Sequence, residues 1–232
     1  RELFSIYIVN LLFTLITLGI YYPWAKVKSK KYIFNNTDFA GSRFAFTGTG
    51  LEIFKGYAVS LFIVALMAGM VFCSRFVSPV LFQFTILLVY IILLLLIPCI
   101  LHSSIKYRTS RTTWRGIHMG YRGSLKKIFL ISIKGTLLTI VTLGIYGAWY
   151  TRNLYSYILS NVRIGSLEIE SNSKGKEFFI LNLKGFVLTT ITFGIYYFWY
   201  KNELYSFYIN NIKIKQGSKA IELKAKSTGW GF

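Results

Sequence analysis

Acidic residues are scarce in this sequence, and charged residues of both signs are few. Only 8 of the 232 residues are Asp or Glu, against 27 Lys and Arg, and all charged residues together make up 15%. An ordinary soluble domain has about 25%. Hydrophobic residues make up 54% and aromatic residues 18%, which excludes a disordered chain. A single soluble core of this size cannot bury so much apolar surface. The composition therefore predicts a membrane protein with basic flanks.

Residues that carry catalytic or metal chemistry are also few. Cys73 and Cys99 lie within apolar runs, and His102 and His118 lie 16 residues apart, without the spacing of metal ligands. No acidic residue lies deep in an apolar segment, and no Walker A, GxSxG or HExxH pattern occurs. We therefore expect no enzymatic activity, no catalytic residue, no metal and no cofactor. The basic charge comes without a nucleic-acid recognition motif, so we expect no nucleic-acid partner.

Stretches free of charged residues predict the membrane spans. Residues 3–25, 56–74 and 76–105 are long enough, because about 20 apolar residues cross the hydrocarbon core. The last two are separated only by residues 74–79, which predicts a tight helical hairpin. Residues 135–151 and 185–200 become long enough only when extended backwards past Lys134 and Lys184, whose stems would reach the membrane surface. These two segments are alternatively re-entrant or interfacial.

The fold class that follows is an all-α membrane protein, a polytopic helical bundle of about five spans. Residues 1–232 are expected to form one membrane domain. The loops after the first and third spans are rich in Lys and Arg, which places them in the cytoplasm and the tip of the hairpin, with Arg75, outside. Two further crossings then leave the C-terminus in the cytoplasm. The chain begins at Arg1, so we expect an initiator segment before it, and the first apolar run is too long for a signal peptide.

A repeat runs through the sequence. The segment TLITLGIYYPW at residues 14–24 recurs at residues 139–149 and 189–199, and a degenerate fourth copy lies between the first two, at a constant offset of 75 from the first. The repeat predicts four units, 1–50, 51–125, 126–175 and 176–232, the second with about 25 extra residues that add one crossing. In each unit an apolar helix would precede a polar, aromatic helix such as residues 25–36 or 150–161. Short alternating segments such as 43–48 and 212–215 would then form β-hairpins in the loops.

The repeated motif has two interpretations. Its Tyr and Trp residues anchor helices at the membrane interface, and its Thr and Gly residues let helices pack closely. Alternatively, the glycines break the helices around a shared cavity, as in transporters built from repeats. The candidate cavity residues are Thr17, Gly19, Tyr21, Trp24, Lys134, Thr142, Gly144, Tyr146, Trp149, Lys184, Thr192, Gly194, Tyr196 and Trp199.

Part of the sequence resembles a known family. The segment TLGIYYPWA at residues 17–25, the basic run up to Tyr32, Asn36-Thr37 and FTGTGLEIFKGY at residues 46–57 are similar to the YjgN family of bacterial inner-membrane proteins, whose function is unknown. The resemblance spans most of the chain and is most specific in residues 14–57. It implies a multi-pass protein of the bacterial inner membrane. It also implies that a Phe-x-Gly-x-Gly piece precedes Glu2, and it supplies no catalytic residue.

The basic loops beneath the spans are the strongest functional candidates. Clusters of this kind attract anionic lipid headgroups by about 1 kcal/mol per charge. The alternative is that these basic residues only set the topology. The candidate headgroup residues are Lys26, Lys28, Lys30, Lys31, Lys106, Arg108, Arg111 and Arg115. We expect a protein that binds or transports a small or lipidic substrate between its repeats. The alternative is a structural protein whose basic cytoplasmic face binds anionic lipids or partner proteins. The expected partner is the lipid bilayer, and formation of a homo-oligomer is left open.

Overall fold

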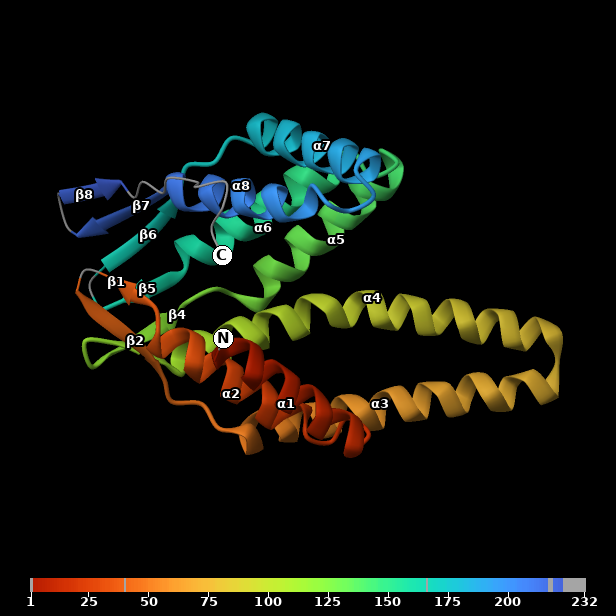
Figure 1. Cartoon of the computed structure of the whole chain (residues 1–232). Coiled ribbons are helices and arrows are strands. Elements are labelled where there is room, and N and C mark those ends of the chain that lie inside the picture. The colour runs from red at the N-terminus through yellow and green to blue at the C-terminus, as the bar shows by residue number, and fades with distance from the viewer. Residues whose placement is uncertain (1, 40, 166, 217–218, 223–232) are drawn as a thin grey trace. The chain divides into compact units, whose positions relative to one another are not determined.

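A computed structural model describes residues 2–39, 41–165, 167–216 and 219–222 and divides the chain into two compact units. Unit 1 covers Arg1–Met119 and unit 2 covers Gly120–Phe232. Figure 1 shows the helices and strands of both. The predicted position of the C-terminus concerns residues 223–232, which lie outside the described part of the chain.

Unit 1 contains four helices and the strands between them. Its helices are α1 (Glu2–Ile16), α2 (Tyr22–Asn35), α3 (Gly50–Val77) and α4 (Pro79–Ser110), and its strands are β1 (Asp38–Phe39), β2 (Ser42–Phe46), β3 (Thr112–Trp114) and β4 (Ile117–Tyr121), the last of which runs into unit 2. Strands β1 to β4 pair antiparallel in chain order. The strands lie at one end of unit 1, and the long α3–α4 hairpin projects from the other (Figure 1).

The α3–α4 hairpin is fixed by local signals at both of its ends. Helix α3 begins with a capping box, in which the side chain of Thr49 accepts from the backbone of Glu52 and the side chain of Glu52 accepts from the backbone of Thr49. At the tip, the Ser78 side chain caps α4 and Pro79 occupies its first turn. At the base, Glu52 accepts from Tyr107 at 3.0 Å and forms an ion pair with Arg111. The predicted tight hairpin is confirmed.

Unit 2 consists of two further helix pairs, each followed by strands. Its elements are α5 (Leu125–Val141), α6 (Gly147–Ser160), β5 (Val162–Ile164), β6 (Leu167–Ser171), α7 (Gly175–Ile191), α8 (Tyr197–Asn210), β7 (Ile212–Gln216) and β8 (Lys219–Glu222). Strands β5 to β8 are antiparallel, in chain order. The most buried apolar side chains described in the unit, Ile128 and Phe178, lie near the starts of α5 and α7.

The three copies of the repeated motif adopt one geometry. In each copy a glycine with φ between 90° and 95° ends the apolar helix, and its N–H donates to the carbonyl five residues earlier, as in a Schellman turn. These bonds join Gly19 to Thr14, Gly144 to Thr139 and Gly194 to Thr189, at 2.7 to 2.8 Å. The Tyr and Trp rings that follow stack with centroids 6.3 to 6.4 Å apart. The fourth, degenerate copy and the four-unit repeat stay predictions.

Close packing within each helix pair depends on one small residue. A Cβ atom on Gly135 would lie 2.1 Å from the Tyr150 ring, and a Cβ atom on Gly185 would lie 2.1 Å from the Tyr200 ring. The corresponding positions in unit 1 have the opposite sizes, Asn10 on α1 and Ala25 on α2. The α1–α2 pair therefore places a polar amide where the other two pairs have no side chain.

The prediction of an all-α bundle of about five spans is wrong. The structure has eight described strands, and within its described residues only α3 and α4 are long and apolar enough to cross a membrane. Helices α1, α5 and α7 have 15, 17 and 17 residues, or about 25 Å at most. The charge-free windows overestimated these spans because the Gly-Ile-Tyr turn is itself apolar, so the uncharged run continues through a chain reversal. The short alternating segments predicted in the loops form strands, including β2 and β7.

Candidate functional site

A cleft between α1 and α2 is a candidate site in unit 1, because its lining combines polar and charged side chains with apolar ones. It has a volume of about 390 Å³ and is lined by polar and apolar side chains from both helices. The lining residues are Tyr7, Asn10, Leu11, Thr14, Tyr22, Ala25, Lys26, Ser29, Lys30 and Ile33. The helix period places Lys26, Ser29 and Lys30 on one face of α2, toward α1.

Asn10 provides the polar group in the wall of this cleft. Its side chain is only 4% exposed, and its amide nitrogen donates to the carbonyl of Ala25 and the hydroxyl of Ser29, both at 3.2 Å. Its Oδ1 atom is buried and accepts no hydrogen bond from the described part of the chain. A buried acceptor without a donor is costly, so a ligand that brings a hydroxyl or amine into the cleft would be stabilised there.

Two half-buried lysines supply positive charge at the cleft. The ammonium of Lys26 lies 5.3 Å from the centre of the Tyr22 ring, and that of Lys30 lies 5.4 Å from the centre of the Phe46 ring. Burial, together with the nearby charges of Arg108 and Lys26, lowers the pKa of Lys30 to about 8. An anion bound between these cations would relieve their mutual repulsion.

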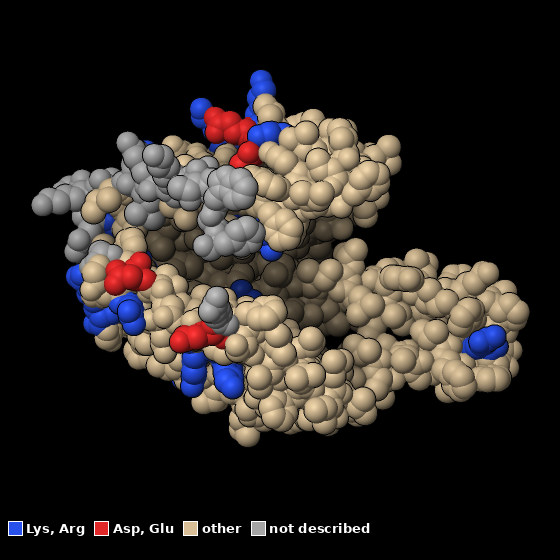
Figure 2. Space-filling view, in the orientation of Figure 1, with Lys and Arg blue, Asp and Glu red and all other residues tan. Residues whose placement is uncertain are grey.

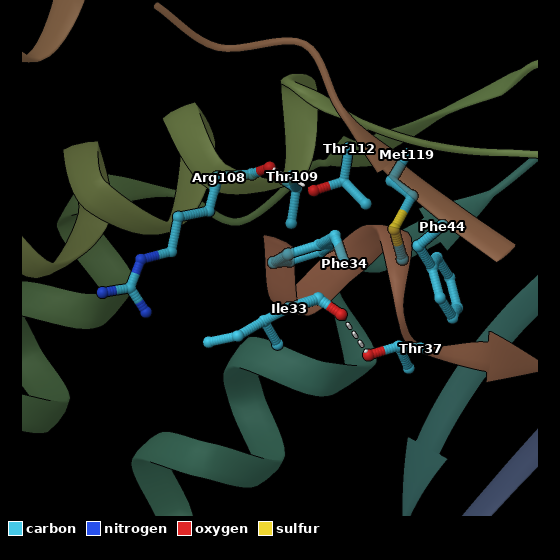
Figure 3. A pocket seen from close by; sticks show the side chains of 8 residues that line it. All are labelled: Ile33, Phe34, Thr37, Phe44, Arg108, Thr109, Thr112 and Met119. Atoms are coloured by element: carbon cyan, nitrogen blue, oxygen red, sulfur yellow. Dashed lines mark hydrogen bonds between the residues drawn. The ribbon is translucent and has the colours of Figure 1, made fainter. Parts of the chain in front are cut away.

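A second cavity continues along α2 toward the strands. Its volume is about 360 Å³, and Ile33 lines both cavities. Figure 3 shows Phe34, Phe44 and Met119 in its wall, and the long side chain of Arg108 extending from α4 away from these three side chains. The hydroxyl of Thr37 donates to the carbonyl of Ile33 at 2.7 Å, also drawn in Figure 3, so this polar side chain is satisfied within the wall. Two mostly apolar cavities with Lys26, Lys30 and Arg108 in their linings suit a molecule with an anionic head and an apolar tail.

Charge is distributed unevenly over unit 1. Figure 2 shows the α3–α4 hairpin as an almost entirely uncharged surface with one basic patch at its tip. The sequence between Lys55 and Lys106 contains Arg75 as its only charged residue. The candidate site therefore lies on the part of unit 1 that carries the charged residues, beside the first turns of the uncharged α3–α4 hairpin.

Comparison with known proteins gives the family. Residues 1–186 match the model of a family described as "Bacterial protein of unknown function (DUF898)". The chain belongs to this family. The family resemblance predicted from the sequence is thereby confirmed.

Curated relatives of this DUF898 protein are named "Inner membrane protein YjgN". The protein from Salmonella typhimurium is 31% identical over 164 residues, which cover 71% of this chain and 38% of the relative. The protein from Escherichia coli O157:H7 is 28% identical over 171 residues, or 68% of this chain and 38% of the relative. The chain thus spans little more than a third of the length of these relatives. No solved structure matches it. The relatives, together with the two apolar helices, support a membrane protein of unknown function.

The predicted headgroup residues of this DUF898 chain separate into three groups. Lys26, Lys30 and Arg108 lie at the two cavities of unit 1. Arg111 pairs with Glu52 at the base of the hairpin, and Arg115 packs on the Trp114 ring and donates to Ser42, so these two have structural partners. The remaining three are exposed: Lys28, Lys31 and Lys106.

The candidate cavity residues are brought together only within each motif. The motif residues of one copy form one turn and the beginning of the next helix, as in the set Thr17, Gly19, Tyr21 and Trp24. The sets at Thr142 and Thr192 repeat the same hydrogen bonds. That they surround a shared cavity stays a prediction. Lys134 is exposed, and Lys184 forms an ion pair with Glu203 at 2.9 Å, which raises the pKa of Lys184.

Sequence reasoning missed Asn10 and Ser29. Asn10 is the only amide side chain in the uncharged run of residues 3–25, and a lone amide in an apolar helix is a signal that it has a hydrogen-bond partner or a ligand. The contact between Asn10 and Ser29 spans 19 residues, and no local pattern reveals it.

Proposed function

We propose that this chain is a non-enzymatic protein of the bacterial inner membrane that binds an anionic phospholipid at the α1–α2 cleft of unit 1. The phosphate would lie between Lys26 and Lys30, and a headgroup hydroxyl would donate to Asn10 Oδ1. An acyl chain would follow the apolar walls. Phosphatidylglycerol combines a negative phosphate with hydroxyl donors, so it is the headgroup chemistry that best fits these three residues.

The observation that carries this proposal is the unpartnered oxygen of Asn10 beside two half-buried lysines. Surface lysines alone would support only a loose electrostatic contact with the membrane. A buried amide acceptor in the same cleft adds a directional contact for a ligand that carries a hydrogen-bond donor. The neighbouring helix pairs have Gly135 and Gly185 at the position of Asn10, so the proposal is specific to unit 1.

The test compares two pairs of lysines on one helix. The protein is reconstituted in phosphatidylcholine vesicles containing traces of spin-labelled phosphatidylglycerol or phosphatidylcholine, and the motionally restricted fraction of each lipid gives their relative association constant. Lys26→Gln with Lys30→Gln should lower the preference for phosphatidylglycerol strongly, by about fivefold per lysine at 1 kcal/mol each.

The matched control is Lys28→Gln with Lys31→Gln, which removes the same charge from exposed positions of α2. If this pair lowers the preference as much as the cleft pair, the effect is general surface charge and the proposal is wrong. Asn10→Leu, which changes no charge, should also lower the preference. An unchanged preference in Asn10→Leu would remove the directional contact from the proposal.

Binding and transport make different predictions for the same vesicles. Transport would move labelled phosphatidylglycerol between leaflets at a rate that depends on Lys26 and Lys30, whereas binding alone leaves the distribution unchanged. The contacts described above support binding. The alternative of a structural protein whose basic face organises lipids uses the same cations without Asn10, so the Asn10→Leu variant separates it from a defined site.

A further inference from the structure

Each of the three short apolar helices ends at a large apolar residue with a left-handed backbone. The φ angle is 49° at Leu18, 50° at Leu143 and 51° at Phe193. This conformation is unfavourable for L-residues, and Gly, Asn and Asp adopt it most readily. The same unfavourable choice at three equivalent turns indicates that the apolar side chain itself has a role.

These three side chains contact almost nothing in the protein. Leu18 is 93% exposed, Leu143 is 95% exposed and Phe193 is 97% exposed. The aliphatic residues on both sides of each turn are also exposed: Ile16, Ile20, Val141, Ile145, Ile191 and Ile195. Contiguous apolar patches of this kind mark surfaces that contact a membrane or another protein.

We call Leu18, Leu143 and Phe193 the tips of their helix pairs. The residues that follow each of these tips are ordered as at a membrane interface. A stacked Tyr–Trp pair comes directly after each turn, and these two residue types concentrate at the level of lipid headgroups. The next charged residues are Lys26, Arg152 and Lys201, eight or nine residues after the tips. Each tip is thus apolar, then aromatic, then charged, which is the order of groups met on leaving a bilayer.

In unit 1, the contact between the α1–α2 turn and α3 indicates how deep Leu18 would lie in a membrane. Gly19 lies against α3, where an added Cβ atom would be 3.2 Å from the Tyr57 hydroxyl. Helix α3 continues for 20 residues beyond Tyr57, to Val77, or about 30 Å, the thickness of the hydrocarbon core. If α3 crosses the bilayer, the neighbouring α1–α2 tip reaches only the near face.

In unit 2, the turns that carry Leu143 and Phe193 lie at the end of the unit opposite its strands. Figure 1 shows the α5–α6 and α7–α8 turns at one end of unit 2 and strands β5 to β8 at the other. Lys134 and Lys184 lie nine residues before the tips, on α5 and α7, about 13 Å along the helix. These charges limit insertion to less than one leaflet.

We propose that Leu18, Leu143 and Phe193 are membrane-inserted tips, and that their three helix pairs enter the acyl region of one leaflet without crossing it. The occupant of these apolar surfaces is the hydrocarbon of the bilayer, because the tips are followed by interfacial aromatics and then by basic residues. This inference rests on the membrane location in the proposed function, but not on the lipid cleft. The cytoplasmic leaflet is the one that the basic residues favour.

The test measures depth at each tip in the full chain. Cys73 and Cys99 are replaced by Ala, Leu18→Cys, Leu143→Cys and Phe193→Cys each carry a nitroxide, and collision rates with oxygen and a water-soluble nickel complex are compared in vesicles. All three tips should lie about 5–10 Å below the phosphates. Matched labels at the exposed positions Lys28→Cys and Lys176→Cys should collide freely with nickel.

Two results would overturn the inference. Tips as accessible to nickel as Lys28→Cys and Lys176→Cys would show that they are in water. Tips at the bilayer centre, about 15 Å deep, would show that the helix pairs penetrate further than one shallow insertion allows. The measurement is repeated in pure phosphatidylcholine, where the same depths are expected even if the phosphatidylglycerol site does not exist.

A second measurement avoids substitution at the strained turns. The unmodified chain is photolabelled by an apolar diazirine dissolved in the acyl region, and the labelled peptides are identified by mass spectrometry. Label should be found around residues 16–20, 141–145 and 191–195 as well as in α3 and α4. Label confined to α3 and α4 would contradict the inference.

Discussion

Single residues determine what the α1–α2 cleft can bind. Asn10 is buried with a free acceptor, and Lys30 is half-buried with a pKa of about 8. The sequence predicted Lys30 as a headgroup residue because the basic run follows an apolar segment. It gave no means to separate Lys30 from Lys28 and Lys31, because the distinction depends on contact with Phe46 and the proximity of Arg108 across the fold.

The pKa of Lys30 predicts a pH dependence for lipid binding. An anionic phosphate binds the protonated lysine, so affinity for phosphatidylglycerol should be full at pH 7 and fall as pH rises through about 8. Loss of one charge near the phosphate corresponds to about fivefold weaker binding. The relative association constant measured between pH 6.5 and pH 9.5 checks this.

The control for this pH dependence is Lys30→Gln. This variant should bind weakly at every pH, with a flat profile over the same range. A profile that keeps its fall in Lys30→Gln would assign the titration to another group.

Helix pairs are the elements repeated through the chain, and their packing is partly visible in the sequence. The repeated motif at residues 14–24, 139–149 and 189–199 was predicted to join an apolar helix to the aromatic helix that follows it. The reversal of the chain at each glycine was not predicted, because Leu or Phe before glycine gives no turn signal by itself and the run stays apolar. The contact of Gly185 with Tyr200 was also not predicted. The equivalent positions of unit 1 are Asn10 and Ala25, so the glycine and the tyrosine are not shared by all three helix pairs.

The Gly185–Tyr200 contact predicts a specific loss of stability. In Gly185→Ala the new methyl would lie 2.1 Å from the Tyr200 ring, an overpacking that costs about 1–3 kcal/mol. Thermal unfolding in detergent, monitored by near-ultraviolet circular dichroism, should have a midpoint about 2–10 °C lower in Gly185→Ala than in the unchanged chain.

A matched substitution exists in α3. Gly56 has open space around an added Cβ atom, so Gly56→Ala should not lower the midpoint and gains helix propensity. Adding Tyr200→Leu to Gly185→Ala should cost less than the two single changes together. If Gly185→Ala unfolds at the same temperature as the unchanged chain, α7 and α8 are not in close contact at this point.

At the scale of the whole molecule, the described residues combine two helices of membrane-spanning length with three shorter helix pairs. Composition alone identified a membrane protein, and residues 56–74 and 76–105 located α3 and α4 correctly. Counting uncharged residues predicted spans wrongly for the other three segments. The count measures the length of the chain and does not detect that the chain reverses within the uncharged run. The strands of both units were expected only as small hairpins, since pairing between β2 and β3 joins residues more than 60 positions apart.

The most direct test of this account is the topology of the α3–α4 hairpin in living cells. In a chain with Cys73 and Cys99 replaced by Ala, Arg75→Cys at the tip and Lys28→Cys on α2 are each exposed to a membrane-impermeant maleimide. We expect Arg75→Cys to react in intact spheroplasts and Lys28→Cys to react only after the membrane is opened. If Arg75→Cys and Lys28→Cys both stay unreactive until the membrane is opened, the two positions lie on the same side and α3 and α4 do not cross the membrane.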